Sequence, residues 1–177
     1  MAVQIGAKPD SGFDDPIGML KDCHRRIESF LNVLCIVAES DQARSLNEDQ
    51  TDAIRAALHY FRVGGQRHNA DEEESLFPRL RAEPAMASFE EIPGLESDHR
   101  TANELHATVE ELYEAWIADR CLSAASQERL LAATQMLKRL YEEHIQIEER
   151  IVFPRASEVL DAGVIARIGE EFRARRR

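Results

Sequence analysis

The sequence has little of what secreted proteins and membrane proteins need. Its 177 residues include only three cysteines, an odd number without a Cys-x-x-Cys pair, so neither a disulfide framework nor a zinc knuckle is indicated. No apolar run approaches the roughly 18 residues that a membrane span requires. The N-terminus lacks the basic start and apolar middle of a signal peptide. We therefore expect a cytoplasmic protein with no membrane partner.

Positive charge is also scarce. The chain has 22 lysines and arginines against 33 aspartates and glutamates, which gives a formal net charge of −11. Such an acidic chain is poorly suited to bind nucleic acid or an anionic membrane. The basic end, RARRR at residues 173–177, is interpreted as a solvated helix terminus rather than a nucleic-acid patch. Motifs of P-loops, dinucleotide folds and nucleophilic triads are absent from the sequence.

No segment alternates with period two, whereas apolar residues recur at helical spacing. Caps and connectors predict helices over about 16–40, 48–80, 95–118 and 123–160, a short fifth helix over 164–172, and a flexible tail over 1–14. Asp15 is expected to be the N-cap of the first helix and Ser123 that of the fourth. Four long amphipathic helices favour an all-α fold, an antiparallel up-down four-helix bundle, with residues 15–177 as one domain. The pair Gly64-Gly65 predicts a bend in the second helix or the close approach of a neighbouring helix.

Polar residues interrupt the inward-facing stripe of each expected helix near a single histidine. The pattern His-x3-Glu-Glu-x3-Phe-Pro occurs twice, over residues 68–78 and 144–154. In the first and third helices, His24 and His99 each follow a leucine by four residues and precede an arginine. The stripe of the fourth helix continues to Ile151. The chain therefore resembles a duplicated helical hairpin.

A glutamate in an apolar stripe needs a cation, because a buried unpaired carboxylate costs several kcal/mol. A single histidine on such a face is usually a core residue with a satisfied hydrogen bond. Burial disfavours protonated histidines, whereas a divalent metal accepts neutral imidazole and carboxylate together. Residues four apart share one helix face, and the histidines alternate early and late along antiparallel helices. The sequence therefore predicts a metal site formed by His24, His68, Glu72, His99, His144 and Glu148.

Two carboxylates among the six donors favour two metal ions bridged by the glutamates, each ion with two histidines. His24 can share an ion with His68, and His99 with His144, but the cross-pairing is equally compatible with the sequence.

The repeated motif is identified as that of the hemerythrin-like, or HHE cation-binding, domains, and the resemblance covers about residues 15–172. It implies a non-heme centre of two iron ions, oxo- or hydroxo-bridged, held by the same six residues with both glutamates bridging. Other divalent metals also fit the donor set.

One position departs from the oxygen-carrying hemerythrins, which have a second histidine four residues after that of the third helix. The residue here is Asn103. Asn103, Glu28, His106 or water is left to complete the coordination. The departure argues against reversible oxygen carriage and favours redox chemistry or sensing.

Several other residues are candidates for hydrogen bonds near this site. Three are candidates for hydrogen bonds to the ligating imidazoles: Tyr60, Glu73 and Glu149. The two glutamates are equally compatible with a solvated face. Tyr141 is a candidate to hydrogen-bond a bound ligand, although such a tyrosine more often packs with its hydroxyl satisfied. Apart from Glu72, the acidic run 71–74 is expected in water, and His59 and His106 are not expected to be ligands.

Three functional classes fit these observations. The first is a di-iron protein that binds or senses dioxygen, peroxide or nitric oxide. The second is a di-iron oxidoreductase, acting as a peroxidase, in nitric oxide reduction or in iron oxidation and repair. The third is a metal-poor or zinc-loaded structural bundle. We favour binding, sensing or reaction with a small molecule, and lean away from a dedicated enzyme.

Overall fold

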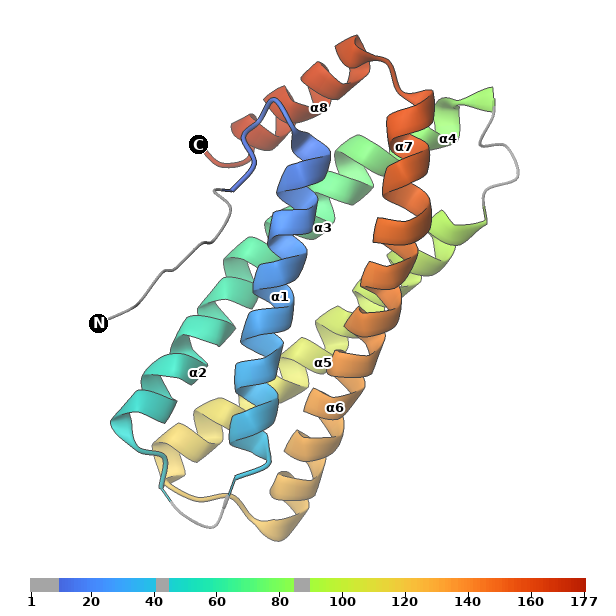
Figure 1. Cartoon of the computed structure of the whole chain (residues 1–177). Coiled ribbons are helices and arrows are strands. Elements are labelled where there is room, and N and C mark those ends of the chain that lie inside the picture. The colour runs from blue at the N-terminus through green and yellow to red at the C-terminus, as the bar shows by residue number, and fades with distance from the viewer. Residues whose placement is uncertain (1–9, 41–44, 85–89) are drawn as a thin grey trace.

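The computed structural model describes residues 10–40, 45–84 and 90–177, and these ranges contain helices and no β-strand. Figure 1 shows the arrangement of the elements. Their bounds are α1 (Pro16–Ala38), α2 (Glu48–Tyr60), η1 (Phe61–Gly65), α3 (Gln66–Asp71), η2 (Glu72–Leu76), α4 (Phe77–Ala82), α5 (Glu91–Asp119), α6 (Ala124–Ile147), η4 (Glu148–Val152), α7 (Phe153–Val159) and α8 (Ala162–Ala174).

The helices form the expected bundle. The run from α2 to α4 is one continuous helical segment, and so is the run from α6 to α7. Together with α1 and α5 they make four antiparallel columns (Figure 1). Helix α1 packs against α2 and α6, and α5 packs against α6 and α2, while α8 lies across one end on α1 and η2. The all-α bundle with a short C-terminal helix is therefore confirmed.

Local capping explains most helix starts. Asp15 caps α1 by accepting a hydrogen bond from the Gly18 amide, and Ser123 caps α6 in the same way, as predicted. Helix α5 begins earlier than predicted, at Glu91, because Pro93 falls in its first turn, where the missing amide hydrogen costs nothing. Asp161 caps α8, so that helix also begins earlier than predicted.

Both long segments contain wide π-helical turns, which the sequence pattern did not predict. One turn begins at Glu72 and another at Glu148, and each is followed by the proline of the repeated motif, Pro78 or Pro154. A proline removes one amide donor and crowds the carbonyl four residues earlier, which here lies inside the π turn. Isolated π turns often occur at functional sites. The motif thus places each glutamate at the start of a widened turn.

The wider turn changes which residue faces inward. Ile151 was predicted to continue the core stripe of its helix, but it is 43% exposed, whereas Val152 is fully buried. Because a π turn holds more residues than an α turn, the inward position moves one residue along the chain. The prediction for Ile151 was therefore wrong.

The glycine pair also lies in a π turn, η1. A methyl group on Gly64 would lie 2.7 Å from the ring of Tyr60. This contact is with a side chain of the same helical segment, so the close approach of a neighbouring helix is not found at Gly64.

The ends of the described chain pack together near α8. Of the tail predicted over residues 1–14, residues 1–9 lie outside the described ranges. Within residues 10–14, the Ser11 amide donates to the carboxylate of Asp22. A methyl group on Gly169 of α8 would lie 1.8 Å from the Phe13 carbonyl oxygen, so only glycine permits this approach.

Two apolar clusters fill the bundle, with the polar residues of the stripes between them. One cluster surrounds Leu34, Tyr113 and Trp116. The other surrounds Phe77 and Phe153 near α8. Within the described ranges, no helix has both the length and the apolar character required to cross a membrane.

Candidate metal centre

The structure brings together all six residues that the sequence singled out. His24 comes from α1, His68 from α3, His99 from α5 and His144 from α6, while Glu72 and Glu148 begin the two π turns. None of the six residues is more than 3% exposed. Their candidate ligand atoms fall into two groups, within each of which all atoms lie within 4.8 Å of one another. These groups are compatible with a metal-binding site.

Each glutamate presents one carboxylate oxygen to each group. Glu72 places Oε1 3.5 Å from Nε2 of His68 and Oε2 3.3 Å from Nε2 of His99. Glu148 places Oε2 3.0 Å from Nε2 of His24 and Oε1 3.3 Å from Nε2 of His144. The histidines are thus paired as His24 with His68 and His99 with His144, with both carboxylates shared, so the structure does not support the cross-pairing.

The atoms that face the centre of this cluster have no hydrogen-bond partner. All four carboxylate oxygens of Glu72 and Glu148 are buried without one, and so is Nε2 of His24, His99 and His144. A folded protein rarely leaves buried polar atoms unsatisfied, because each costs about 1–3 kcal/mol. So many buried ligand atoms without a hydrogen-bond partner are compatible with a site that a cation completes.

Three of the imidazoles are oriented by a second carboxylate. Nδ1 of His24 lies 2.9 Å from Oε1 of Glu149, and Nδ1 of His99 lies 2.7 Å from Oε1 of Glu73. Nδ1 of His144 lies 3.3 Å from Oδ2 of Asp98. A carboxylate at Nδ1 fixes the tautomer that leaves Nε2 free for a metal.

Of these three carboxylates, sequence reasoning had named Glu73 and Glu149 but missed Asp98. The duplication shows why His68 differs from the other histidines. Asp98 precedes His99, and the corresponding residue before His24 is Cys23, which has no carboxylate. Nδ1 of His68 is accordingly buried without a partner. Asp98 lies beside the stripe of α5 and not in it, so the sequence spacing gave no signal for its pairing with His144.

The electrostatics of the cluster show the same need for a cation. Burial raises the pKa of Glu72 well above its usual range, and the negative charge of Glu148 adds to this shift. Burial opposes the charging of His24 and His144, but the carboxylate of Glu148 outweighs it and raises the pKa of both imidazoles. Burial lowers the pKa of His68. Metal ions can displace the protons that the cluster otherwise holds.

The phenylalanines of the repeated motif cover the cluster on one side. The ring of Phe153 stacks on His24 with centroids 5.5 Å apart, and Phe77 lies parallel to His99 at 6.4 Å. Both rings are fully buried. They exclude water and thereby strengthen electrostatic interactions within the site.

The other candidates for coordination lie away from the cluster. Asn103 is exposed and accepts a hydrogen bond from Gln66, while Glu28 is exposed beside a cavity between α1 and α6. His59 is exposed, and His106 bonds to Tyr141 rather than entering the cluster.

Tyr60 does not make the predicted hydrogen bond to a ligating imidazole. Its hydroxyl donates to the backbone carbonyl of Cys23 and not to an imidazole.

The C-terminal arginines overturn two expectations. Arg175 and Arg176 were expected in water, and so was Asp71. Asp71 is instead fully buried, with Oδ1 2.9 Å from Arg175 and Oδ2 2.6 Å from Arg176. Two guanidinium groups from the segment that follows α8 thus pair with this buried carboxylate.

We expect the second carboxylates to control metal affinity. Replacing Glu73 or Glu149 with alanine frees the imidazole of His99 or His24 to rotate, which should weaken metal binding about 10- to 100-fold without unfolding the bundle. Competition with a chromophoric chelator measures the affinity. Glu143, which is exposed on α6, supplies the control: Glu143→Ala should match the wild type, and equal affinities in all four proteins would refute the role of these carboxylates.

Comparison with known proteins agrees with this arrangement. An uncharacterized protein of Haemophilus influenzae is 26% identical over 169 residues, which cover 93% of this chain and 91% of the relative. The family model described as the hemerythrin HHE cation binding domain matches residues 15–156, which include all six residues of the cluster. The chain therefore belongs to the hemerythrin HHE cation-binding domain family.

Proposed function

We propose that the cluster holds two iron ions and that the protein binds, senses or reacts with dioxygen or a related small molecule such as peroxide or nitric oxide. The observation that carries the proposal is the position of Glu72 and Glu148, which each present one oxygen to one histidine pair and the other oxygen to the second pair. A site for a single ion gives no role to two shared carboxylates.

The proposed ligand set gives each ion two imidazoles and one oxygen from each glutamate. One ion would be held by His24 and His68, and the other by His99 and His144. Nitrogen and oxygen donors without thiolate suit iron, zinc and manganese, so the choice of iron rests on the resemblance to hemerythrin-like domains. A bound di-iron centre supplies coordination positions and electrons for chemistry with small oxygen or nitrogen species.

The surrounding residues support this role in distinct ways. Asp98, Glu73 and Glu149 orient the imidazoles, while Phe77 and Phe153 keep water from one side of the site. The exposed side chain of Asn103 leaves the protein with no further ligand from this position of α5. A coordination position that the protein leaves open favours the binding of a small molecule over a purely structural metal.

Optical assays of the iron-loaded protein separate binding from catalysis. A change in absorbance that appears with oxygen and reverses on its removal would support binding or sensing. Sustained consumption of peroxide with a reductant, at a rate far above that of free iron, would favour the oxidoreductase. Unchanged helicity and stability after metal removal, with no response to any of these molecules, would contradict the proposal and favour a structural bundle.

A further inference from the structure

One buried hydrogen bond near the centre has no part in the proposed metal ligation. Nε2 of His106, on α5, lies 3.1 Å from the hydroxyl of Tyr141, on α6. Tyr141 is 6% exposed, and the described residues offer its hydroxyl no other hydrogen-bond partner. A buried phenol with a single partner retains capacity for a second hydrogen bond.

This pair lies beside the metal centre, on the side where the chain supplies no further ligand. Tyr141 precedes His144 by one helical turn, and their rings are 6.4 Å apart. The ring of Tyr141 meets that of His144 edge-on, so the phenol lies against an imidazole of the cluster. Because α5 and α6 are antiparallel, the turn after His99, which contains Asn103, lies level with Tyr141.

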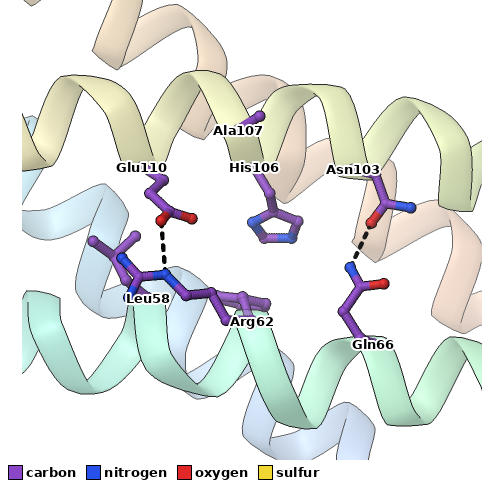
Figure 2. Close-up of a pocket in the computed structure, with 8 residues that line it drawn as sticks. Leu58, Arg62, Gln66, Asn103, His106, Ala107 and Glu110 are labelled. Atoms are coloured by element: carbon purple, nitrogen blue, oxygen red, sulfur yellow. Dashed lines mark hydrogen bonds and ion pairs between the residues drawn. The ribbon is translucent and has the colours of Figure 1, made fainter.

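The other face of His106 borders a surface cavity of about 190 Å³ between the α2–α3 segment and α5. Figure 2 shows His106 between two cross-helix contacts, the Arg62–Glu110 ion pair and the hydrogen bond from Gln66 to Asn103. The described residues provide no hydrogen-bond partner for its Nδ1. Water in this cavity can therefore reach one nitrogen of the ring while the other bonds to Tyr141.

The imidazole of His106 is neutral, as a group that passes a proton between Tyr141 and the cavity must be. Burial lowers the pKa of His106 to about 4, so the ring is neutral near pH 7. A neutral imidazole donates through one nitrogen and accepts through the other. It can therefore accept a hydrogen bond from Tyr141 while donating to water, or donate to Tyr141 while accepting from water.

We propose that Tyr141 donates a hydrogen bond to a small anion held at the metal centre, and that the Tyr141–His106 pair carries a proton between that molecule and the cavity. The proposal rests on the function proposed above. When a weak acid binds as its anion, its proton passes to the phenol oxygen, the phenol proton passes to Nε2, and the proton on Nδ1 leaves to water. One proton enters the path and one leaves it, and the phenol ends as donor to the anion.

Azide, as a small anion of a weak acid, tests the first part. Loss of a hydrogen bond to a charged group should weaken azide binding to the iron-loaded protein about tenfold or more in Tyr141→Phe, as measured by optical titration. The matched control is Tyr113→Phe, since the Tyr113 hydroxyl is also buried but donates to the Leu34 carbonyl in the far apolar cluster. Equal azide affinity in Tyr141→Phe and wild type would overturn the proposal.

His106 is expected to take the proton from Tyr141 and to hold its hydroxyl in place, and not to be a metal ligand. His106→Leu should keep the full metal content but bind cyanide at least about tenfold more slowly in stopped-flow experiments near pH 7, because cyanide is then present as hydrogen cyanide and its proton loses its path. His106→Gln, whose amide can still bond to Tyr141, should keep more azide affinity than His106→Leu. The exposed His59 provides the control variant His59→Leu. Unchanged binding rates, or loss of metal from His106→Leu, would overturn this role.

Nitrogen-15 NMR of the metal-free protein gives a readout that does not depend on iron. His106 should show one protonated and one unprotonated ring nitrogen at pH 7, and a doubly protonated ring would overturn the proposal. Failure of the wild type to load two metal ions would defeat the proposed function as well. Normal loading with unchanged azide affinity in Tyr141→Phe and an unchanged rate of cyanide binding in His106→Leu would defeat the roles of Tyr141 and His106 but not the proposed function.

Discussion

Replacing Glu72 with glutamine is expected to abolish binding of the metal pair and, at the same time, to stabilise the metal-free protein. Both effects follow from the same carboxylate, which is fully buried and has no hydrogen-bond partner at either oxygen. An amide has nearly the same shape but carries no negative charge to bridge two cations. It also removes the mutual repulsion between Glu72 and Glu148, which the metal-free fold must otherwise tolerate.

The raised pKa of Glu72 determines how the stability of the metal-free protein depends on pH. The pKa of Glu72 is raised in the folded protein, so folding favours its protonated form. Its contribution therefore destabilises the metal-free fold increasingly as pH rises above about 4.3, the ordinary value of an unfolded glutamate. Glu72→Gln removes this contribution and should gain about 1–3 kcal/mol in the free energy of unfolding at pH 7.

Urea denaturation of chelator-treated proteins measures that gain, and elemental analysis measures the metals. Glu72→Ala separates the two effects, since it also loses the metals but leaves an unfilled space in the core and should not be stabilised to the same extent. The exposed Glu143, replaced by glutamine, should change neither property. Full retention of two metals in Glu72→Gln, or a less stable metal-free variant, would contradict the bridging assignment.

Removing both Arg175 and Arg176 is expected to cost about 3–5 kcal/mol of folding stability, because it leaves the carboxylate of Asp71 buried and unpaired. Asp71 is fully buried and directly precedes Glu72, so the arginines of the C-terminal segment hold the helix that carries a proposed metal ligand. We therefore expect Arg175→Ala with Arg176→Ala to weaken metal retention as well as lower the melting temperature.

Two further variants show whether the buried charge is the cause. Adding Asp71→Asn to the double variant removes that charge and should restore much of the lost stability. Arg177, which is exposed at the end of the chain, should tolerate alanine with a change within about 0.5 kcal/mol. A double variant as stable as the wild type, or one that Asp71→Asn fails to rescue, would show that the ion pairs do not hold the helix.

Much of the fold and of the site could be predicted from local patterns. Helix-period stripes identified the four columns, and caps such as Asp15 and Ser123 fixed their starts. The six cluster residues were identified because the apolar stripe of each helix contains polar residues at only one height. In an antiparallel bundle, the directions of the helices determine whether these heights coincide. This reasoning needs only sequence spacing, and therefore succeeded.

Contacts made by residues beside the apolar stripe, or by residues far apart in the sequence, could not be predicted in this way. Asp71 meets Arg176 across 105 positions of the chain, and no local pattern links them. Asp98 lies beside the stripe rather than in it, so its bond to His144 depends on the rotation of two helices. The π turn after Glu148 shifts the inward position by one residue, which a constant helical period cannot represent.

Elemental analysis of protein purified without added metal, alongside an optical spectrum, tests the central claim most directly. The arrangement of Glu72 and Glu148 between two histidine pairs predicts about two metal ions per chain. If these are iron, near-ultraviolet bands of an oxo-bridged ferric pair should accompany them. A single zinc ion per chain, or no metal in a fully folded and stable protein, would contradict a shared centre and assign the cluster a structural role.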